Sequence, residues 1–154
     1  MPTDPVPTDA PTPTADTEAA SANRRSTITP YICVHDARLA IEWYGDIFGA
    51  AVSYEPIIQD DGRVGHAEVT IGNATLMLSD EFPEIGVVSP RNHEGSSLAL
   101  SVTVPDVDDT YTRATAAGAT GLRPPEDQFY GERAATLLDP FGHRWMIGTP
   151  LETD

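Results

Sequence analysis

The chain has 154 residues, 40% of them hydrophobic, and this length suffices for one domain with a core. Its formal net charge of −15 argues against nucleic-acid binding, because phosphate contacts require clustered cations. All nine basic residues are arginines, so lysine Schiff-base chemistry is excluded, and the single cysteine excludes an intramolecular disulfide. No apolar run reaches the roughly 20 residues of a membrane helix. The N-terminus has no basic start followed by an apolar stretch, so we expect no secretory signal. We therefore expect a cytoplasmic protein with neither nucleic acid nor membrane as a partner.

The first 26 residues differ in composition from the rest of the chain. They consist mostly of Pro, Thr, Ala and Asp and contain hardly any large apolar side chain. Such a segment cannot bury enough surface to offset the entropy lost on ordering. We expect a disordered tail over residues 1–26 and a single folded domain over 27–150.

The first half of this domain, residues 27–80, has the pattern of a strand, a helix and three further strands. A strand is expected over 31–34, and Asp36 can cap the following helix because its carboxylate accepts from a free amide of the first turn. Gly49 is expected to end the helix. The apolar side chains between them have helical spacing and would form one buried face: Ala40, Trp43, Tyr44 and Ile47. The further strands are expected over 51–57, 64–71 and 75–79.

After a connector over 81–95, the same order of elements recurs over 96–150. A strand is expected over 98–104, Asp106 offers a second helix cap, and Gly118 is expected to close that helix. The apolar face of this helix would be formed by Val107, Tyr111, Ala114 and Ala117. The last strands are expected near 119–122, 133–138 and 144–148. A repeat of this length predicts duplicated units that bury surface against each other.

Three stretches resemble the vicinal oxygen chelate superfamily, which includes glyoxalase I, bleomycin-resistance proteins, fosfomycin-resistance enzymes and extradiol dioxygenases. They are YICVHDARLAIEWYGDIFGA at 31–50, VGHAEVTIGNATLMLSD at 64–80 and FYGERAATLLDPFGHRWMI at 129–147. The last stretch is similar to the PhnB-like branch. The resemblance implies an α+β fold in which two βαβββ modules form a curved, barrel-like mixed sheet around a small-molecule cavity.

Metal-dependent members of this superfamily take one His or Glu ligand from each of four strand positions, and the resemblance puts Thr29, Glu68, Ser97 and Met146 at those positions. Only Glu68 suits a hard divalent cation, because neutral hydroxyls are weak ligands and a thioether suits soft metals. A catalytic metal has about three protein ligands. We therefore expect no cofactor, with Glu68 and His66 as the ligands if a divalent metal binds.

His66 and Glu68 are two residues apart on an expected strand, so their side chains share one face of the sheet. As catalytic residues they would share a proton and provide a general base, or form half of a metal site. The alternative is a hydrogen-bonded polar pair that shapes a pocket or lies on a solvated strand face.

Other candidate ligand-binding residues follow from strand alternation and from clustering. The cavity face would carry Tyr31, Cys33, Ser97, Ser101, Arg144 and Met146. An inward Arg144 would clamp a carboxylate or phosphate, or else pair with Glu68 or another acid. Phe129, Tyr130 and Arg133 precede the closing hairpin and would stack on a flat ligand and pair with its acid group, or simply anchor the loop.

Three functions stay open on the sequence. The first is a protein that binds a small organic molecule without the usual metal quartet, for example to sequester a drug. The acidic balance would suit a cationic ligand, or would only keep the protein soluble. The second is a lyase, isomerase or dioxygenase of the glyoxalase superfamily that depends on a metal or on His66 and Glu68. The third is a non-catalytic scaffold. A homodimer is expected in each case, because open sheet edges need covering. Whether modules pair within one chain or across two is open.

Overall fold

The computed structural model describes residues 26–90 and 96–152. The tail expected over 1–26 lies almost entirely outside the described residues, as does part of the connector. The described elements, in chain order, are β1 (Tyr31–Cys33), α2 (Ala37–Phe48), β2 (Ala51–Ile58), β3 (Val64–Ile71), β4 (Ala74–Ser79), the 3-10 helix η1 (Pro83–Ile85), β5 (Ala99–Thr103), α3 (Val107–Ala116), β6 (Thr120–Gln128), β7 (Glu132–Leu138) and β8 (Arg144–Pro150).

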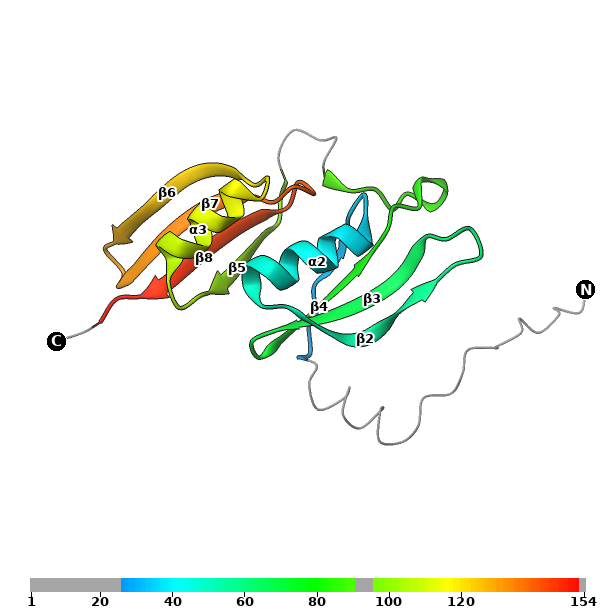
Figure 1. The fold of residues 1–154 in the computed structure, drawn as a ribbon, viewed down its shortest axis with the longest axis horizontal. Coiled ribbons are helices and arrows are strands. Elements are labelled where there is room, and N and C mark those ends of the chain that lie inside the picture. The colour runs from blue at the N-terminus through cyan, green and yellow to red at the C-terminus, as the bar shows by residue number, and fades with distance from the viewer. Residues whose placement is uncertain (1–25, 91–95, 153–154) are drawn as a thin grey trace, which may run out of the picture.

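The strands form two four-stranded mixed sheets with the orders β1-β4-β3-β2 and β5-β8-β7-β6. The first strand of each module pairs in parallel, β1 with β4 and β5 with β8, and the remaining pairs are antiparallel. Figure 1 shows the two modules side by side, each sheet with its helix. The expected α+β fold of two βαβββ modules is confirmed. The sheets are not closed into one barrel, because β1 and β5 are both edge strands.

Helix α2 begins and ends where its sequence signals predict. The carboxylate of Asp36 accepts from the Leu39 amide at 3.1 Å, and Gly49 follows the helix with φ 70°, a left-handed conformation that glycine adopts without strain. The side chains at helical spacing are buried, with Tyr44 at 0% and Trp43 at 8% exposure. Local sequence therefore accounts for this helix and for its buried face.

Helix α3 buries a different face from the one expected. Asp106 caps it as predicted, accepting from the Asp109 amide at 3.2 Å. Its buried side chains are Val107, Thr110 and Ala114, whereas Tyr111 is only partly buried and Ala117 is an exposed residue beyond the helix end. A hydroxyl therefore lies on the buried face of α3, at the place that Ala40 holds in α2.

Strand β6 is longer than expected and runs through two prolines, Pro124 and Pro125. Proline cannot donate to a sheet ladder, but β6 is an edge strand, where one side of the backbone needs no partner. The pairing with β7 is irregular between Arg123 and Glu126. This irregularity lets the strand continue past the prolines.

The two modules are joined through a buried carboxylate, Asp139, at the turn between β7 and β8. The Tyr44 hydroxyl of α2 and the Trp145 indole donate to its Oδ2 at 2.6 and 2.8 Å. The amides of Phe141 and His143 both donate to its Oδ1 at 2.9 Å. Burial, and then the negative charge of Asp139, raises the pKa of the Tyr44 hydroxyl well above its usual value. Tyr44 therefore stays a proton donor that links the first module to the second.

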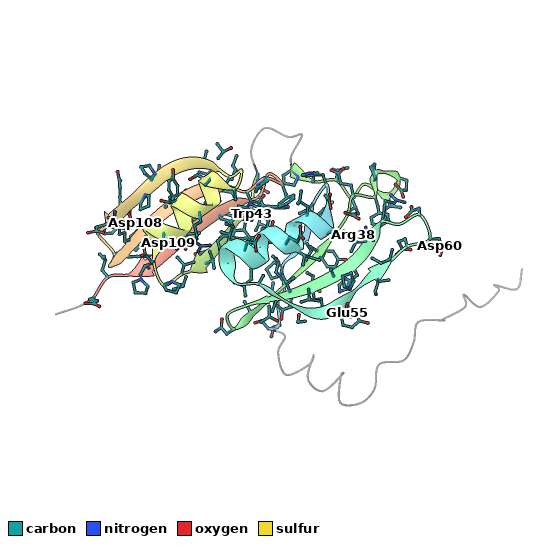
Figure 2. The ribbon with its side chains drawn as sticks, viewed as in Figure 1. Arg38, Trp43, Glu55, Asp60, Asp108 and Asp109 are labelled. Carbon is teal, nitrogen blue, oxygen red and sulfur yellow. The ribbon has the colours of Figure 1, made fainter. Side chains whose placement is uncertain are left out.

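Two further hydrogen bonds cross between the modules. The Trp43 indole donates to the Ala117 carbonyl at 3.0 Å, and a ring nitrogen of His143 lies 2.8 Å from the Cys33 carbonyl. Trp43 lies where α2 meets the second module (Figure 2). Within the described residues, neither helix has the length and apolarity that a membrane crossing requires.

Candidate functional site

The first sheet has one face under α2 and one face without a helix. Along β1, β3 and β4, the side chains of Ile32, Ala67 and Leu78 enter the core. The alternate residues point the other way and form what we call the helix-free face of the first sheet: Tyr31, Cys33, His66, Glu68, Met77 and Ser79. The strand alternation thus gathers four of the expected site residues on one surface.

Three polar side chains interact on this face: Tyr31, His66 and Glu68. The Tyr31 hydroxyl donates to the Gly65 carbonyl at 3.1 Å, and its oxygen lies 2.9 Å from His66 Nδ1. Which of the two groups donates in the Tyr31–His66 contact depends on the tautomer of the ring. His66 Nε2 faces Glu68 Oε1 at 3.6 Å. The ring therefore lies between a phenol and a carboxylate.

The surroundings of the three groups differ in exposure. The Glu68 side chain is 4% exposed and lies behind His66, whose side chain is 24% exposed. Burial raises the pKa of the Tyr31 hydroxyl, so it remains neutral and able to donate near neutral pH. The His66 ring is 5.2 Å from the ring of Tyr31 and 6.1 Å from that of Tyr54. A molecule arriving from solvent meets Tyr31 and His66 first, and Glu68 acts from behind them.

A hollow of about 470 Å³ adjoins these residues. Tyr31, Cys33 and Ser79 line it from the sheet, and Phe82, Ile85 and Val87 line it from the segment after β4. The Cys33 thiol lies 3.6 Å from the Asp80 carbonyl, to which it donates. Burial, followed by the charges of Glu81 and Asp80, raises the pKa of Cys33 to about 11. Cys33 is therefore a thiol rather than a nucleophilic thiolate at neutral pH.

Arg63 fixes the segment over residues 81–89, which we call the strap, beside this hollow. Its guanidinium contacts Asp61 and Glu84 at 2.7 and 2.6 Å and donates to the Glu81 carbonyl at 3.2 Å. The same group lies 4.1 Å from the centre of the Phe82 ring. One arginine thus ties the β2–β3 turn to the strap through charge and stacking together.

The helix-free face of the second sheet carries the equivalent positions with different chemistry. Ser101, Met146 and Thr136 are paired across β5, β8 and β7, as Tyr31, Met77 and Glu68 are across β1, β4 and β3. Met146 is 44% exposed, and the exposed Arg144 forms no ion pair within the described residues. The second sheet therefore presents neutral side chains where the first presents an acid and a phenol.

The resemblance put Thr29, Glu68, Ser97 and Met146 at the positions of metal ligands, but these residues do not occupy matching positions in the two sheets. The counterpart of Met146 is Met77 and not Glu68, and Thr29 and Ser97 precede strands β1 and β5. In residues 26–90 and 96–152, no group of three or more His, Cys, Asp or Glu side chains is arranged to hold a metal ion. On the helix-free face of the first sheet, His66 and Glu68 are therefore a pair of possible donors and not a group of three.

Of the three residues expected to bind a ligand before the closing hairpin, Arg133 is separated from the other two. Phe129 is fully exposed and packs edge-on against Tyr130, with ring centres 5.3 Å apart, at the β6–β7 turn. Arg133 lies on the helix side of β7, where it contacts Asp108 at 2.7 and 2.9 Å and Asp127 at 3.0 Å. Asp108 lies on the outer part of α3 (Figure 2). These two carboxylates pair with the guanidinium in the structure.

A second hollow, a cleft of about 720 Å³, lies between the modules and was not expected from the sequence. It is lined by the end of α2, the β3–β4 turn, β5 and three side chains of the second module, Thr110, Arg113 and Trp145. Among the expected ligand-binding residues, Ser101 lines this cleft, whereas Tyr31 and Cys33 line the smaller hollow. The cleft arises from the docking of two modules, which local sequence does not predict. The feature of the sequence that points toward it is Thr110, a polar residue on the buried face of α3.

Comparisons with known proteins agree with this architecture. A family model described as the Glyoxalase/Bleomycin resistance protein/Dioxygenase superfamily matches residues 26–147. The uncharacterized protein Rv0887c of Mycobacterium tuberculosis is 34% identical over 137 residues, which are 87% of this chain and 80% of that protein. The uncharacterized protein Mb0911c of Mycobacterium bovis is 36% identical over 132 residues, 84% and 86% of the two chains.

The fold is shared by solved structures, among them the following two. TioX from Micromonospora sp. ML1 superposes with a TM-score of 0.62 and 26% identity, over 82% of this chain and 99% of that one. A Bacillus cereus protein described as a putative 3-demethylubiquinone-9 3-methyltransferase, PhnB protein, gives a TM-score of 0.63 and 19% identity, over 80% and 99%. At that identity the second likeness concerns the fold alone.

Proposed function

Since the chain belongs to the glyoxalase/bleomycin resistance protein/dioxygenase superfamily, we propose that it binds a small organic molecule on the helix-free face of its first sheet, without a metal ion. The observation that carries the proposal is the hollow beside Tyr31 and His66. It combines an apolar wall from the strap with a few convergent polar groups, as small-molecule sites do, and its volume of about 470 Å³ falls in their usual range.

The lining defines the chemistry of the ligand. Tyr31 and Gln59 offer hydrogen bonds from the lining, and Phe82 and Ile85 offer an apolar wall for a flat ring. His66 lies next to this lining, with its Nδ1 2.9 Å from the Tyr31 oxygen. The carboxylate of Glu68 lies behind His66, and the chain carries a formal charge of −15, so a positive charge on the ligand is favoured. An aromatic molecule with a cationic nitrogen fits these groups.

The donor chemistry supports the metal-independent form of the proposal. His66 and Glu68 are two suitable donors, but the neighbouring Tyr31 and Cys33 both have raised pKa values. A metal ligand must be deprotonated, so a phenol and a thiol that hold their protons are poor additions to the pair. A divalent cation would thus find two ligands where a catalytic site usually supplies about three.

A homodimer completes the proposal. Each helix-free face carries side chains that one chain leaves open, among them Tyr31 at 48% and Met146 at 44% exposure. Strands β1 and β5 also leave one edge unpaired. Two-fold pairing is the commonest way to cover such surfaces. Sedimentation of the full chain tests this expectation, and a monomer at all concentrations would contradict it.

Calorimetric titration of the full chain with cationic aromatic compounds and with aromatic acids tests the binding proposal. We expect saturable binding of a cationic compound, weakened about 5- to 10-fold by Tyr31→Phe, because one hydrogen bond is worth about 1 kcal/mol. Tyr130→Phe is the matched control, since Tyr130 is exposed and lies at the far turn of the second module. Absence of saturable binding would refute the proposal and favour a non-catalytic scaffold, and equal affinity in Tyr31→Phe would show that the compound does not bind in this hollow.

A second candidate is a lyase or isomerase that moves a proton with His66. Glu68 faces its Nε2 and orients the ring, as the carboxylate does beside a general base, and a substrate proton would reach Nδ1 at the place of the exposed Tyr31 hydroxyl. Exchange of a substrate proton for deuterium, followed by NMR, would detect this chemistry. We expect exchange to fall at least about 100-fold in His66→Ala, in line with the usual contribution of a positioned base. Unchanged exchange would reject the candidate.

A further inference from the structure

We infer that the cleft between the two modules is a second binding site, which takes a neutral, mainly apolar small molecule and holds it by a hydrogen bond to Thr110. Its volume of about 720 Å³ lies within the range of small-molecule pockets. None of its lining residues lines the hollow proposed above. The inference therefore does not depend on the proposed function.

Both modules build the walls of the cleft. The first module contributes the last turn of α2 and the β3–β4 turn, and the second contributes β5 and α3. Figure 1 shows the end of α2 directed toward β5. Leu76, Leu100, Val102 and Trp145 give the cleft an apolar lining. Trp145 is held in place by its bond to Asp139, so the wall it forms is rigid.

Thr110 supplies the observation that points to a ligand. It is 3% exposed, it lines the cleft, and its side chain makes no hydrogen bond within the described residues. Among the described residues, the fully buried side-chain atoms without a partner are His35 Nδ1 and Thr70 Oγ1, so the Thr110 oxygen is reached from the cleft that it lines. The equivalent residue of α2 is Ala40, which is fully buried and has no hydroxyl. A polar atom of a bound molecule would provide the partner that the protein itself does not.

The charges around the cleft favour a neutral ligand. Arg113 lines it, but its Nε contacts Asp109 at 2.9 Å, and its Nη1 and Nη2 donate to the carbonyls of Asp46 and Ile47 at 2.8 and 3.4 Å. The guanidinium is thus neutralised and its donors serve the end of α2. The exposed Asp46 also lines the cleft and disfavours an anion.

The neutral fluorescent amine N-phenyl-1-naphthylamine tests the inference on the full chain. We expect saturable enhancement of dye emission together with quenching of tryptophan emission, because Trp145 forms part of the wall. Val102→Phe fills the cleft and should weaken binding at least about 10-fold, since it removes apolar contact area. Thr110→Val preserves shape and should weaken binding about 5-fold through loss of the hydrogen bond. Thr112→Val is the matched control, as Thr112 is exposed on the same helix.

Thermal unfolding of each variant shows that it is folded, and Thr110→Val remains informative if Val102→Phe is not. Dye affinity that is the same in the wild type, Val102→Phe and Thr110→Val would overturn the inference. An equal loss of dye binding in His66→Ala would overturn it as well, because the dye would then occupy the helix-free face of the first sheet. Loss in both cleft variants, with Thr112→Val and His66→Ala at wild-type affinity, would support it.

Discussion

Replacing Tyr44 by phenylalanine removes one of the four hydrogen bonds to Asp139 and leaves the ring in place. The hydroxyl is fully buried and lies 2.6 Å from a carboxylate that is itself 4% exposed. A hydrogen bond to a charged group contributes about 1.5–3 kcal/mol. Because three other donors still hold Asp139, we expect a loss near the middle of this range, about 2 kcal/mol.

Urea unfolding followed by tryptophan fluorescence measures this loss, which should lower the midpoint without changing the slope. In a domain of this size the same loss lowers Tm by about 4–8 °C. Tyr130→Phe is the matched control, since Tyr130 is 55% exposed, and its effect should stay within about 0.5 kcal/mol. A Tyr44→Phe effect as small as that of the control would refute the role assigned to this bond.

Asp139→Asn should cost more, about 3–5 kcal/mol, because it removes the charge from a buried site with four donors. The new amide group also cannot accept from the Trp145 indole, which donates to Oδ2 at 2.8 Å. The double variant with Tyr44→Phe should be less damaging than the sum of the two, since both act on one network. Additive effects would contradict the shared network.

Three other expectations follow from the pKa values and the ion pairs. Since the pKa of Tyr44 is raised in the folded state, its contribution to stability is complete below the unfolded value of about 10 and is lost at higher pH, so alkaline unfolding should be milder in Tyr44→Phe. Cys33, with a pKa of about 11, should react with iodoacetamide at a rate that keeps rising between pH 8 and 10, whereas free cysteine levels off near its pKa of about 8.5. Arg63→Leu should increase cleavage by proteases within the strap at residues 81–89, and equal cleavage in both proteins would show that Arg63 does not fix the strap.

Features that depend on neighbouring residues were accessible from the sequence. Asp36 and Gly49 delimit α2 because a cap and a left-handed turn are local interactions. The strand over 64–71 also has its predicted bounds. By contrast, β6 continues through Pro124 and Pro125 because it is an edge strand, and strand position within a sheet is not visible in local sequence.

In the candidate site, too, local sequence predicted some features, whereas others depend on how distant segments pack. Strand alternation placed His66 and Glu68 on one face, but the contact of His66 with Tyr31 depends on β4 lying between β1 and β3, which alternation does not reveal. The sequence left open whether Arg133 binds a ligand or anchors the loop, and its contact with Asp108, a residue of α3 far from it in sequence, depends on how α3 packs on β7. The inter-module cleft requires knowledge of how the two modules dock.

The reciprocal docking of the modules bears on how the chain can be divided. Tyr44 completes the turn of the second module, while Ala117 and His143 supply partners to Trp43 and to the Cys33 carbonyl in the first. A cut in the connector would therefore leave each fragment with polar groups that its own residues cannot satisfy. We expect the two fragments to regain native structure only when mixed, which makes this chain a natural candidate for a split, self-assembling pair.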